Sequence, residues 1–119
     1  MGGALRPGPD SGGFVVWVEP EDGAQGVFRD PVVLVRVSQP VDPASLAQLH
    51  VRDEAGTVPS RLETSPDLRV LIWRPERLLR PGTEHVIIME GLRDRRGQAL
   101  PDFRSRFVCG TLAQADLSE

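Results

Sequence analysis

The chain has 119 residues, which is enough for one domain with a core of moderate size. Hydrophobic residues make up 39% and charged residues 26%, so the composition is that of a soluble globular protein and excludes a wholly disordered chain. The net charge of −3 argues against a nucleic-acid-binding protein, and a single cysteine, Cys109, excludes an internal disulfide and a cysteine-based zinc site.

Residues 1–13 are rich in glycine and proline and predict a flexible leader or linker. They lack the basic-then-apolar layout of a signal peptide, so an export signal is not expected within this segment. No stretch of the chain approaches the ~20 apolar residues that span a bilayer, which argues against direct membrane insertion.

From Phe14 onward the chain alternates between β-rich runs and turns. Residues 14–20 and 32–40 each predict a strand ended by proline, and residues 21–31 between them predict turn and loop. The stretch VDPASLAQ that follows predicts one helical or 3₁₀ turn, with Asp42 as N-cap and Pro43 in the first helical position.

The second half continues the same pattern. Residues 49–65 predict two short strands about a glycine-bearing turn, and 68–75, 84–92 and 103–112 predict one strand each. Residues 113–119 are expected to form a polar C-terminal segment. A spacing of about ten residues between β-rich runs is typical of a β-sandwich, and no segment has the helical period that parallel crossovers need.

Alternation along the predicted strands indicates which face packs inward. Val33, Val35 and Val37 form one apolar face, while Phe103 and Phe107 lie opposite to two arginines on their strand. The remaining expected core residues are Leu71, Trp73, Ile87 and Met89. Trp73 is the side chain whose removal is expected to destabilise the fold most.

Four turn motifs occur in a fixed order: Pro-x-Asp-Gly-Ala at 20–24, Ser-x-Pro-Val-Asp at 38–42, Leu-x-Pro-Gly-Thr at 79–83 and Leu-x-Asp-x-x-Gly at 92–97. Together they resemble the bacterial Ig-like domain of the SbsA type, a repeat of surface-layer and other secreted bacterial proteins. The resemblance covers residues 14–112. It implies an immunoglobulin-like antiparallel sandwich of about seven strands, serving as one module of a longer exported chain.

Two positions depart from that family. Where its members usually have the tyrosine of a tyrosine corner, this chain has His85, and where the last strand usually has threonine it has Cys109. We interpret His85 as a substitute for the corner phenol rather than as a catalytic base, although Glu84 is adjacent. Cys109 is expected to face the core, with an intermolecular disulfide as the alternative.

Charged residues suggest two further sites. Glu19, Glu21, Asp22, Asp42 and Asp94 lie in turns and could bind calcium, but turn chemistry explains them better because Asp bonds its own backbone there. A possible polyanion contact is formed by Arg93, Arg95, Arg96, Arg104 and Arg106. The alternative is that these arginines only protect an exposed sheet edge from pairing with another chain.

Some strands are apolar on both faces. Val86, Ile88 and Val108 are expected on neighbouring strands of the outer surface, where they would form a possible interface with an adjacent domain or a second copy of the chain. The alternative is that they only favour strand formation.

The sequence thus predicts a non-catalytic structural or interaction module of a larger extracellular, cell-surface or periplasmic bacterial protein. No nucleophile, phosphate loop or metal-ligand spacing supports an enzyme, and no cofactor is expected. Its partners would be neighbouring domains or another copy of the chain. The alternative is an accessory module that binds carbohydrate or cell-wall polymer, with or without the help of calcium. Trp17 is the aromatic residue available for such binding.

Overall fold

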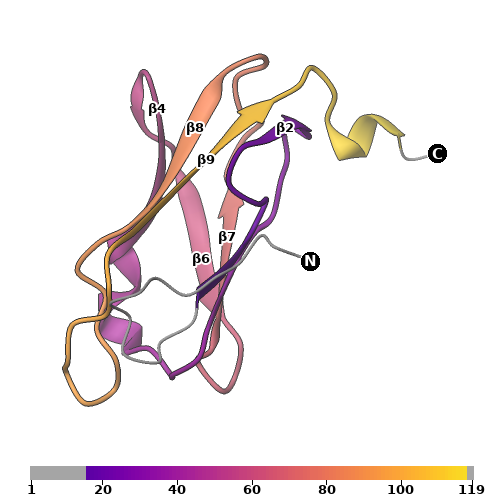
Figure 1. Cartoon of the computed structure of the whole chain (residues 1–119). Coiled ribbons are helices and arrows are strands. Elements are labelled where there is room, and N and C mark those ends of the chain that lie inside the picture. The colour runs from indigo at the N-terminus through magenta and orange to yellow at the C-terminus, as the bar shows by residue number, and fades with distance from the viewer. Residues whose placement is uncertain (1–15, 118–119) are drawn as a thin grey trace.

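The computed structural model describes residues 16–117. The leader predicted for 1–13 and the start of the domain predicted at Phe14 lie outside the described residues. Figure 1 shows two β-sheets that face each other as two layers, with the chain crossing between them. The predicted all-β, immunoglobulin-like sandwich is therefore confirmed, with one parallel pair of strands among otherwise antiparallel pairs.

The first sheet has four strands in the order β1-β3-β7-β6, and every neighbouring pair is antiparallel. The strands are β1 (Val16–Glu19), β3 (Val33–Val37), β7 (Val70–Pro75) and β6 (Ser60–Thr64). Their register places Val18, Val35 and Leu71 side by side across three strands. All three side chains are buried, so this row lines the core on the side of the four-stranded sheet.

The second sheet has five strands in the order β2-β9-β8-β4-β5. They are β2 (Ala24–Val27), β9 (Phe103–Cys109), β8 (Glu84–Met89), β4 (Leu49–Asp53) and β5 (Gly56–Thr57). Residues 16–117 thus contain nine strands, where seven were expected. The two additional strands are β2 and the two-residue β5.

The prediction of turn and loop for residues 21–31 was wrong in its central part, because β2 pairs in parallel with β9. Its sequence, AQGV, has weak strand propensity and contains a glycine. Tertiary contacts compensate, since Ala24 and Val27 pack against the core and lie in register with Phe107 and Cys109. A Cβ on Gly110 would lie 3.3 Å from the Cα of Gly26, so the two strands approach closely where neither has a side chain.

The core lies between the sheets and follows the predicted alternation. Val33, Val35, Leu71, Trp73, Ile87, Met89 and Phe107 have exposures of 0%, and Val37 one of 6%. Phe103 packs against the core but is only partly buried. Each large apolar side chain buried in this way contributes roughly 1.5–3 kcal/mol of transfer free energy.

Two short 3₁₀ helices complete the described part. In η1 (Pro43–Gln48), Asp42 is the N-cap and accepts a hydrogen bond from the N–H of Ala44 at 3.0 Å, as predicted. Residues Gln114–Leu117 of the predicted C-terminal segment form η2, and Ala113 before it is 1% exposed. Neither of these helices within residues 16–117 has the length and apolar character needed to cross a membrane.

The two tryptophans provide a test of the core assignment, because Trp73 is 0% and Trp17 50% exposed. We expect Trp73→Ala to reduce the free energy of unfolding by about 3–5 kcal/mol through lost burial and a residual cavity. Trp17→Ala is expected to cost less than about 1 kcal/mol. Urea unfolding followed by circular dichroism measures both, and equal losses would contradict the assignment.

Candidate functional site

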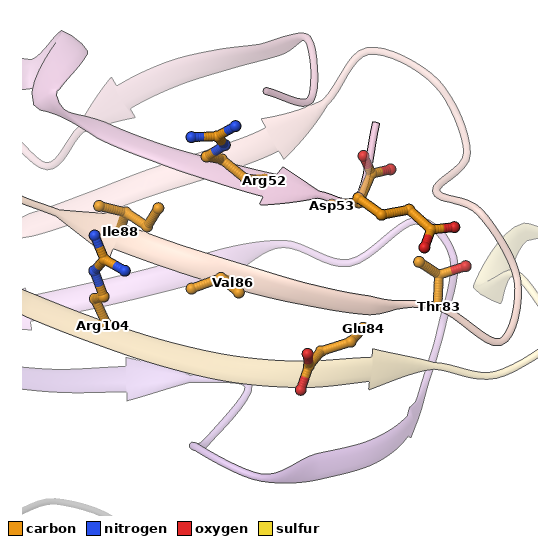
Figure 2. A pocket seen from close by; sticks show the side chains of 8 residues that line it. Arg52, Asp53, Thr83, Glu84, Val86, Ile88 and Arg104 are labelled. Carbon is orange, nitrogen blue, oxygen red and sulfur yellow. The ribbon is translucent and has the colours of Figure 1, made fainter. Parts of the chain in front are cut away.

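Val86 and Ile88 lie on the outer face of the five-stranded sheet, where their cross-strand neighbours are three arginines and a histidine. Val86 is flanked by Arg52 on β4 and Arg106 on β9. Ile88 is flanked by His50 and Arg104, and it is only 6% exposed. Figure 2 shows the two apolar side chains lying between Arg52 and Arg104.

Val108, the third residue of the expected interface, lies opposite Glu84 on β8 and diagonal to Val86. The three predicted residues therefore share one face, where charged residues alternate with them. Arginine stems cover apolar surface while their charged ends remain in water, which is consistent with the low exposure of Ile88.

The five arginines predicted as a strip divide into two groups. Arg104 and Arg106 lie on the outer face of β9, where Arg104 bonds to Glu90 at 2.8 Å and Arg106 lies 3.9 Å from Glu84. The other three, Arg93, Arg95 and Arg96, are exposed in the loop between β8 and β9. Arg104 and Arg106 therefore share the outer face of the five-stranded sheet with Val86 and Ile88. Each of these two arginines has a carboxylate neighbour.

Most of the acidic residues considered for calcium accept hydrogen bonds from backbone N–H groups. Asp22 Oδ1 accepts from Arg106 at 2.9 Å, and Asp42 caps η1. Asp94 is 5% exposed, and its Oδ1 accepts from the N–H groups of Arg96 and Gln98, both at 2.9 Å. Within residues 16–117 no three His, Cys, Asp or Glu side chains gather in a metal-binding arrangement. These carboxylates act in separate turns.

The Asp94 bonds lead to a direct test. Asp94→Ala is expected to reduce stability by about 2 kcal/mol, because it leaves two N–H groups of the loop without their charged acceptor. Added calcium is expected to leave the melting temperature of the unmodified protein unchanged. Differential scanning calorimetry with calcium and with chelator measures both effects, and a rise with calcium would restore the metal hypothesis.

His85 is a fully buried histidine on the inward face of β8. Its exposure is 0%, and its ring stacks on Phe107 with 5.2 Å between ring centroids and 9° between ring planes. The Nδ1–H donates to the carbonyl of Thr83 at 3.0 Å, which leaves the lone pair on Nε2. The Nε2 atom has no hydrogen-bond partner.

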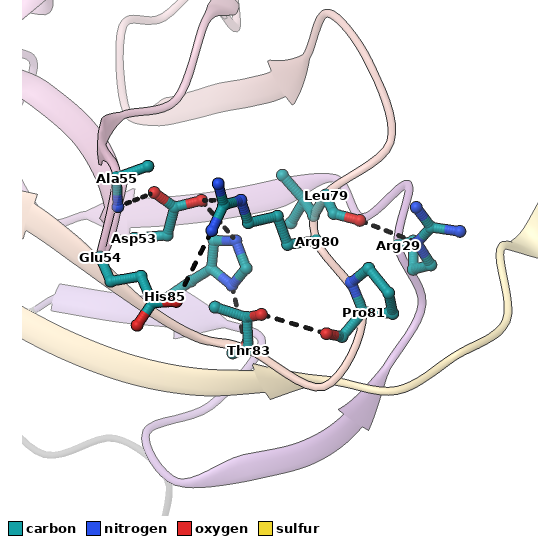
Figure 3. Close-up of polar contacts among 9 residues, drawn as sticks. All are labelled: Arg29, Asp53, Glu54, Ala55, Leu79, Arg80, Pro81, Thr83 and His85. Atoms are coloured by element: carbon teal, nitrogen blue, oxygen red, sulfur yellow. Dashed lines mark hydrogen bonds and ion pairs between the residues drawn. The ribbon is translucent and has the colours of Figure 1, made fainter.

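Acidic and basic groups surround this imidazole at one end of the sandwich (Figure 3). Asp53 Oδ2 lies 3.8 Å from His85 Nε2, and Arg80 lies 3.9 Å from the same oxygen and 3.6 Å from Glu54. Burial lowers the pKa of His85 below its usual 6.5. Thr83 and Asp53 act in the opposite direction, and Arg80 adds to the lowering.

The sequence predicted a structural role for His85 but missed Asp53 and Arg80 beside it. Asp53 belongs to a turn in which its Oδ1 accepts a hydrogen bond from the N–H of Ala55 at 2.8 Å. From the sequence alone, its role is therefore explained by the turn. Only the pairing of β4 with β8 brings its second oxygen to the imidazole. No sequence signal indicates this contact. Because His85 is inaccessible in the folded state, its imidazole does not contact solvent-borne substrates.

Cys109 is buried on the inward face of β9 with 1% exposure, as predicted. Burial raises the pKa of its thiol to about 11, although the positive charge of Arg29 acts to lower it. The thiol is therefore protonated at neutral pH and has little nucleophilic character.

The fold defines the class of the protein as an immunoglobulin-like β-sandwich, and comparisons with solved structures agree with it. Surface layer protein SbsC, domains 1–6, matches with a TM-score of 0.56 and 16% identity over 78% of this chain and 13% of that one. CopC from Methylosinus trichosporium OB3b matches with a TM-score of 0.62 and 17% identity over 80% of this chain and 93% of that one.

L,D-transpeptidase 3 from Mycobacterium tuberculosis matches with a TM-score of 0.55 and 20% identity over 80% of this chain and 37% of that one. The chain thus spans only a small part of the surface-layer and transpeptidase structures. No protein-family model matches the chain, and no curated protein matches it in sequence. At these identities the likeness establishes a shared fold.

His85 also determines an expected pH dependence of stability. Its folded-state pKa is lowered, so below pH 6.5 the unfolded chain binds a proton that the folded chain does not. Stability should therefore fall as pH drops from 6.5 towards the lower folded pKa, by at most about 1.4 kcal/mol per pH unit. Above pH 6.5 this contribution is fully present.

Urea unfolding at pH 5–8 measures this slope. The matched control is His85→Phe, which keeps a ring against Phe107 but cannot ionise. The variant should lose the part of the slope that His85 contributes below pH 6.5. An unchanged slope would assign the dependence to other groups.

Proposed function

We propose that this chain is a non-catalytic spacer module of a larger exported or cell-surface bacterial protein, and that it transmits tension between neighbouring domains. The sequence resemblance to SbsA-type domains of surface-layer proteins supports this proposal. The fold is shared with a surface layer protein in which the matched region is 13% of the chain. A location outside the cytoplasm, at the cell surface or in the periplasm, is part of the same proposal.

The observation that carries the proposal is a parallel seam between two segments near the ends of the described chain, residues 22–30 and 106–115. Gly23 N–H donates to Arg106 at 2.7 Å, and Gly110 N–H donates to Val27 at 2.8 Å. Further along, Arg29 N–H donates to the carbonyl of Leu112 at 2.9 Å. The seam therefore extends beyond the paired strands β2 and β9.

Two aspartates reinforce the seam. Asp22 accepts from the N–H of Arg106, and Asp30 accepts from Gln114 at 2.6 Å and Ala115 at 3.1 Å. When the ends of the chain are pulled apart, parallel strands must slide along each other, so the bonds of the seam are strained together. An antiparallel hairpin pulled from its open end loses its bonds one at a time. The seam thus suits a module that is pulled through its ends.

Force spectroscopy on tandem copies tests this function. Each copy is expected to unfold in a single cooperative event. The variant Asp22→Ala/Asp30→Ala removes three side-chain bonds from the seam and should lower the unfolding force.

The matched control is Asp42→Ala/Asp67→Ala, which removes three comparable bonds elsewhere. Its equilibrium stability should fall, at about 1 kcal/mol for the lost N-cap, while its unfolding force changes less. Equal losses of force in the two variants would contradict a mechanical role for the seam. A cytoplasmic catalytic domain encoded next to this chain would contradict the exported location.

A further inference from the structure

The outer face of the four-stranded sheet contains a second candidate site. It includes none of the arginines that the sequence predicted as a polyanion contact. A groove of about 340 Å³ is lined there by Trp17, Arg36, Val37, Ser38, Asp67, Arg69 and Val70. That volume is at the lower end of the range of small-ligand sites, and it suits one or two sugar rings. The groove is distant in the fold from the His85 cluster, which belongs to the other sheet.

The register of three strands brings the side chains of the groove together. Trp17 on β1 lies opposite Arg36 on β3, and Arg36 lies opposite Val70 on β7. The side chain of Trp17 is 50% exposed, so one of the largest apolar side chains of the protein is open to solvent beside a guanidinium group. An indole ring offers an apolar, electron-rich face to a ligand.

The turn after β6 forms the other wall and is firmly attached. Val37 N–H donates to Arg69 at 2.8 Å, and Val41 N–H donates to Leu68 at 2.9 Å. Asp67 Oδ1 accepts from Ser65 Oγ at 2.6 Å and from the N–H of Arg69 at 3.1 Å. The wall is thus ordered before any ligand arrives, which lowers the entropic cost of binding.

Charge distinguishes this groove from the outer face of the other sheet. There, Arg104 and Arg106 have carboxylate neighbours. In the part of the chain that the structure describes, Arg36 forms no ion pair. The hydrogen bond from Ser65, the hydrogen bond from the N–H of Arg69 and the charge of Arg69 lower the pKa of Asp67. The groove therefore contains one carboxylate and two guanidinium groups. The groove thus has an excess of positive charge, which favours an anionic ligand.

We propose that this groove binds a carboxylate-bearing glycan, with Trp17 stacking on a sugar ring and Arg36 and Arg69 pairing with its carboxylate. The C–H groups on a pyranose face fit an aromatic surface. Guanidinium groups pair with carboxylates in a planar, two-bond geometry, and the second oxygen of Asp67 accepts sugar hydroxyl hydrogens. Because this site lies apart from the seam of residues 22–30 and 106–115, it stands independently of the proposed mechanical function.

Titration with oligogalacturonate, followed by calorimetry and tryptophan fluorescence in 0.15 M salt, tests the proposal on the full chain. Binding should change the emission of Trp17, and Trp17→Ala should weaken it by about tenfold or more. Trp17→Phe should retain part of the affinity, because a smaller ring remains. Arg36→Gln and Arg69→Gln should each weaken binding and reduce its salt dependence.

Three controls separate this site from general attraction between charges. Arg61→Gln, an exposed arginine on β6 of the same sheet, should bind as the unmodified protein does. The methyl ester of the same oligosaccharide should bind more weakly, since it has lost the anionic charge. Polyglutamate should also bind more weakly, since it offers no sugar face.

Several outcomes would overturn the proposal. They are no binding at millimolar oligogalacturonate, equal binding of polyglutamate, equal binding of the methyl ester, or unchanged affinity of Trp17→Ala. Self-association that Trp17→Ala abolishes, measured by analytical ultracentrifugation, would instead assign the groove to a second copy of the chain. Circular dichroism and thermal melting establish that each variant is folded, so a loss of binding is assigned to the groove.

Discussion

The parallel pairing of β2 with β9 is the constraint that closes one edge of the sandwich and ties the first part of the described chain to its last strand. It requires close backbone contact at Gly26 and Gly110. With β9 held on that side, β8 lies on its other side and places His85 against Phe107. On the far side of β8, β4 pairs with it and brings Asp53 to the imidazole.

The same geometry explains why a polar imidazole is tolerated inside an apolar core. His85 satisfies one nitrogen through Thr83, and its neutral form avoids the cost of a buried charge. Its other nitrogen faces Asp53 without a hydrogen bond. The imidazole thus packs as a neutral ring, and burial lowers its pKa below the usual 6.5.

The sequence was informative wherever the controlling interaction is local or periodic. Alternation placed Val33 and Trp73 inward, and the Asp42-Pro43 pair located η1. It was uninformative where residues distant in sequence determine the outcome. Strand β2 forms because β9 offers a pairing edge, although its own residues favour a turn. Similarly, the Trp17 groove depends on the register of three strands and on a turn fifty residues away, and no short motif encodes that register.

The two outer faces of the sandwich also differ in what they can recognise. On the five-stranded sheet, arginines and carboxylates alternate with Val86 and Ile88, so the face is largely neutralised and its apolar residues are partly covered. A ligand there would have to displace existing ion pairs. On the four-stranded sheet, an exposed indole lies next to a guanidinium group that forms no ion pair within residues 16–117. Binding to this face breaks none of the ion pairs within residues 16–117, which makes it the better surface for a ligand.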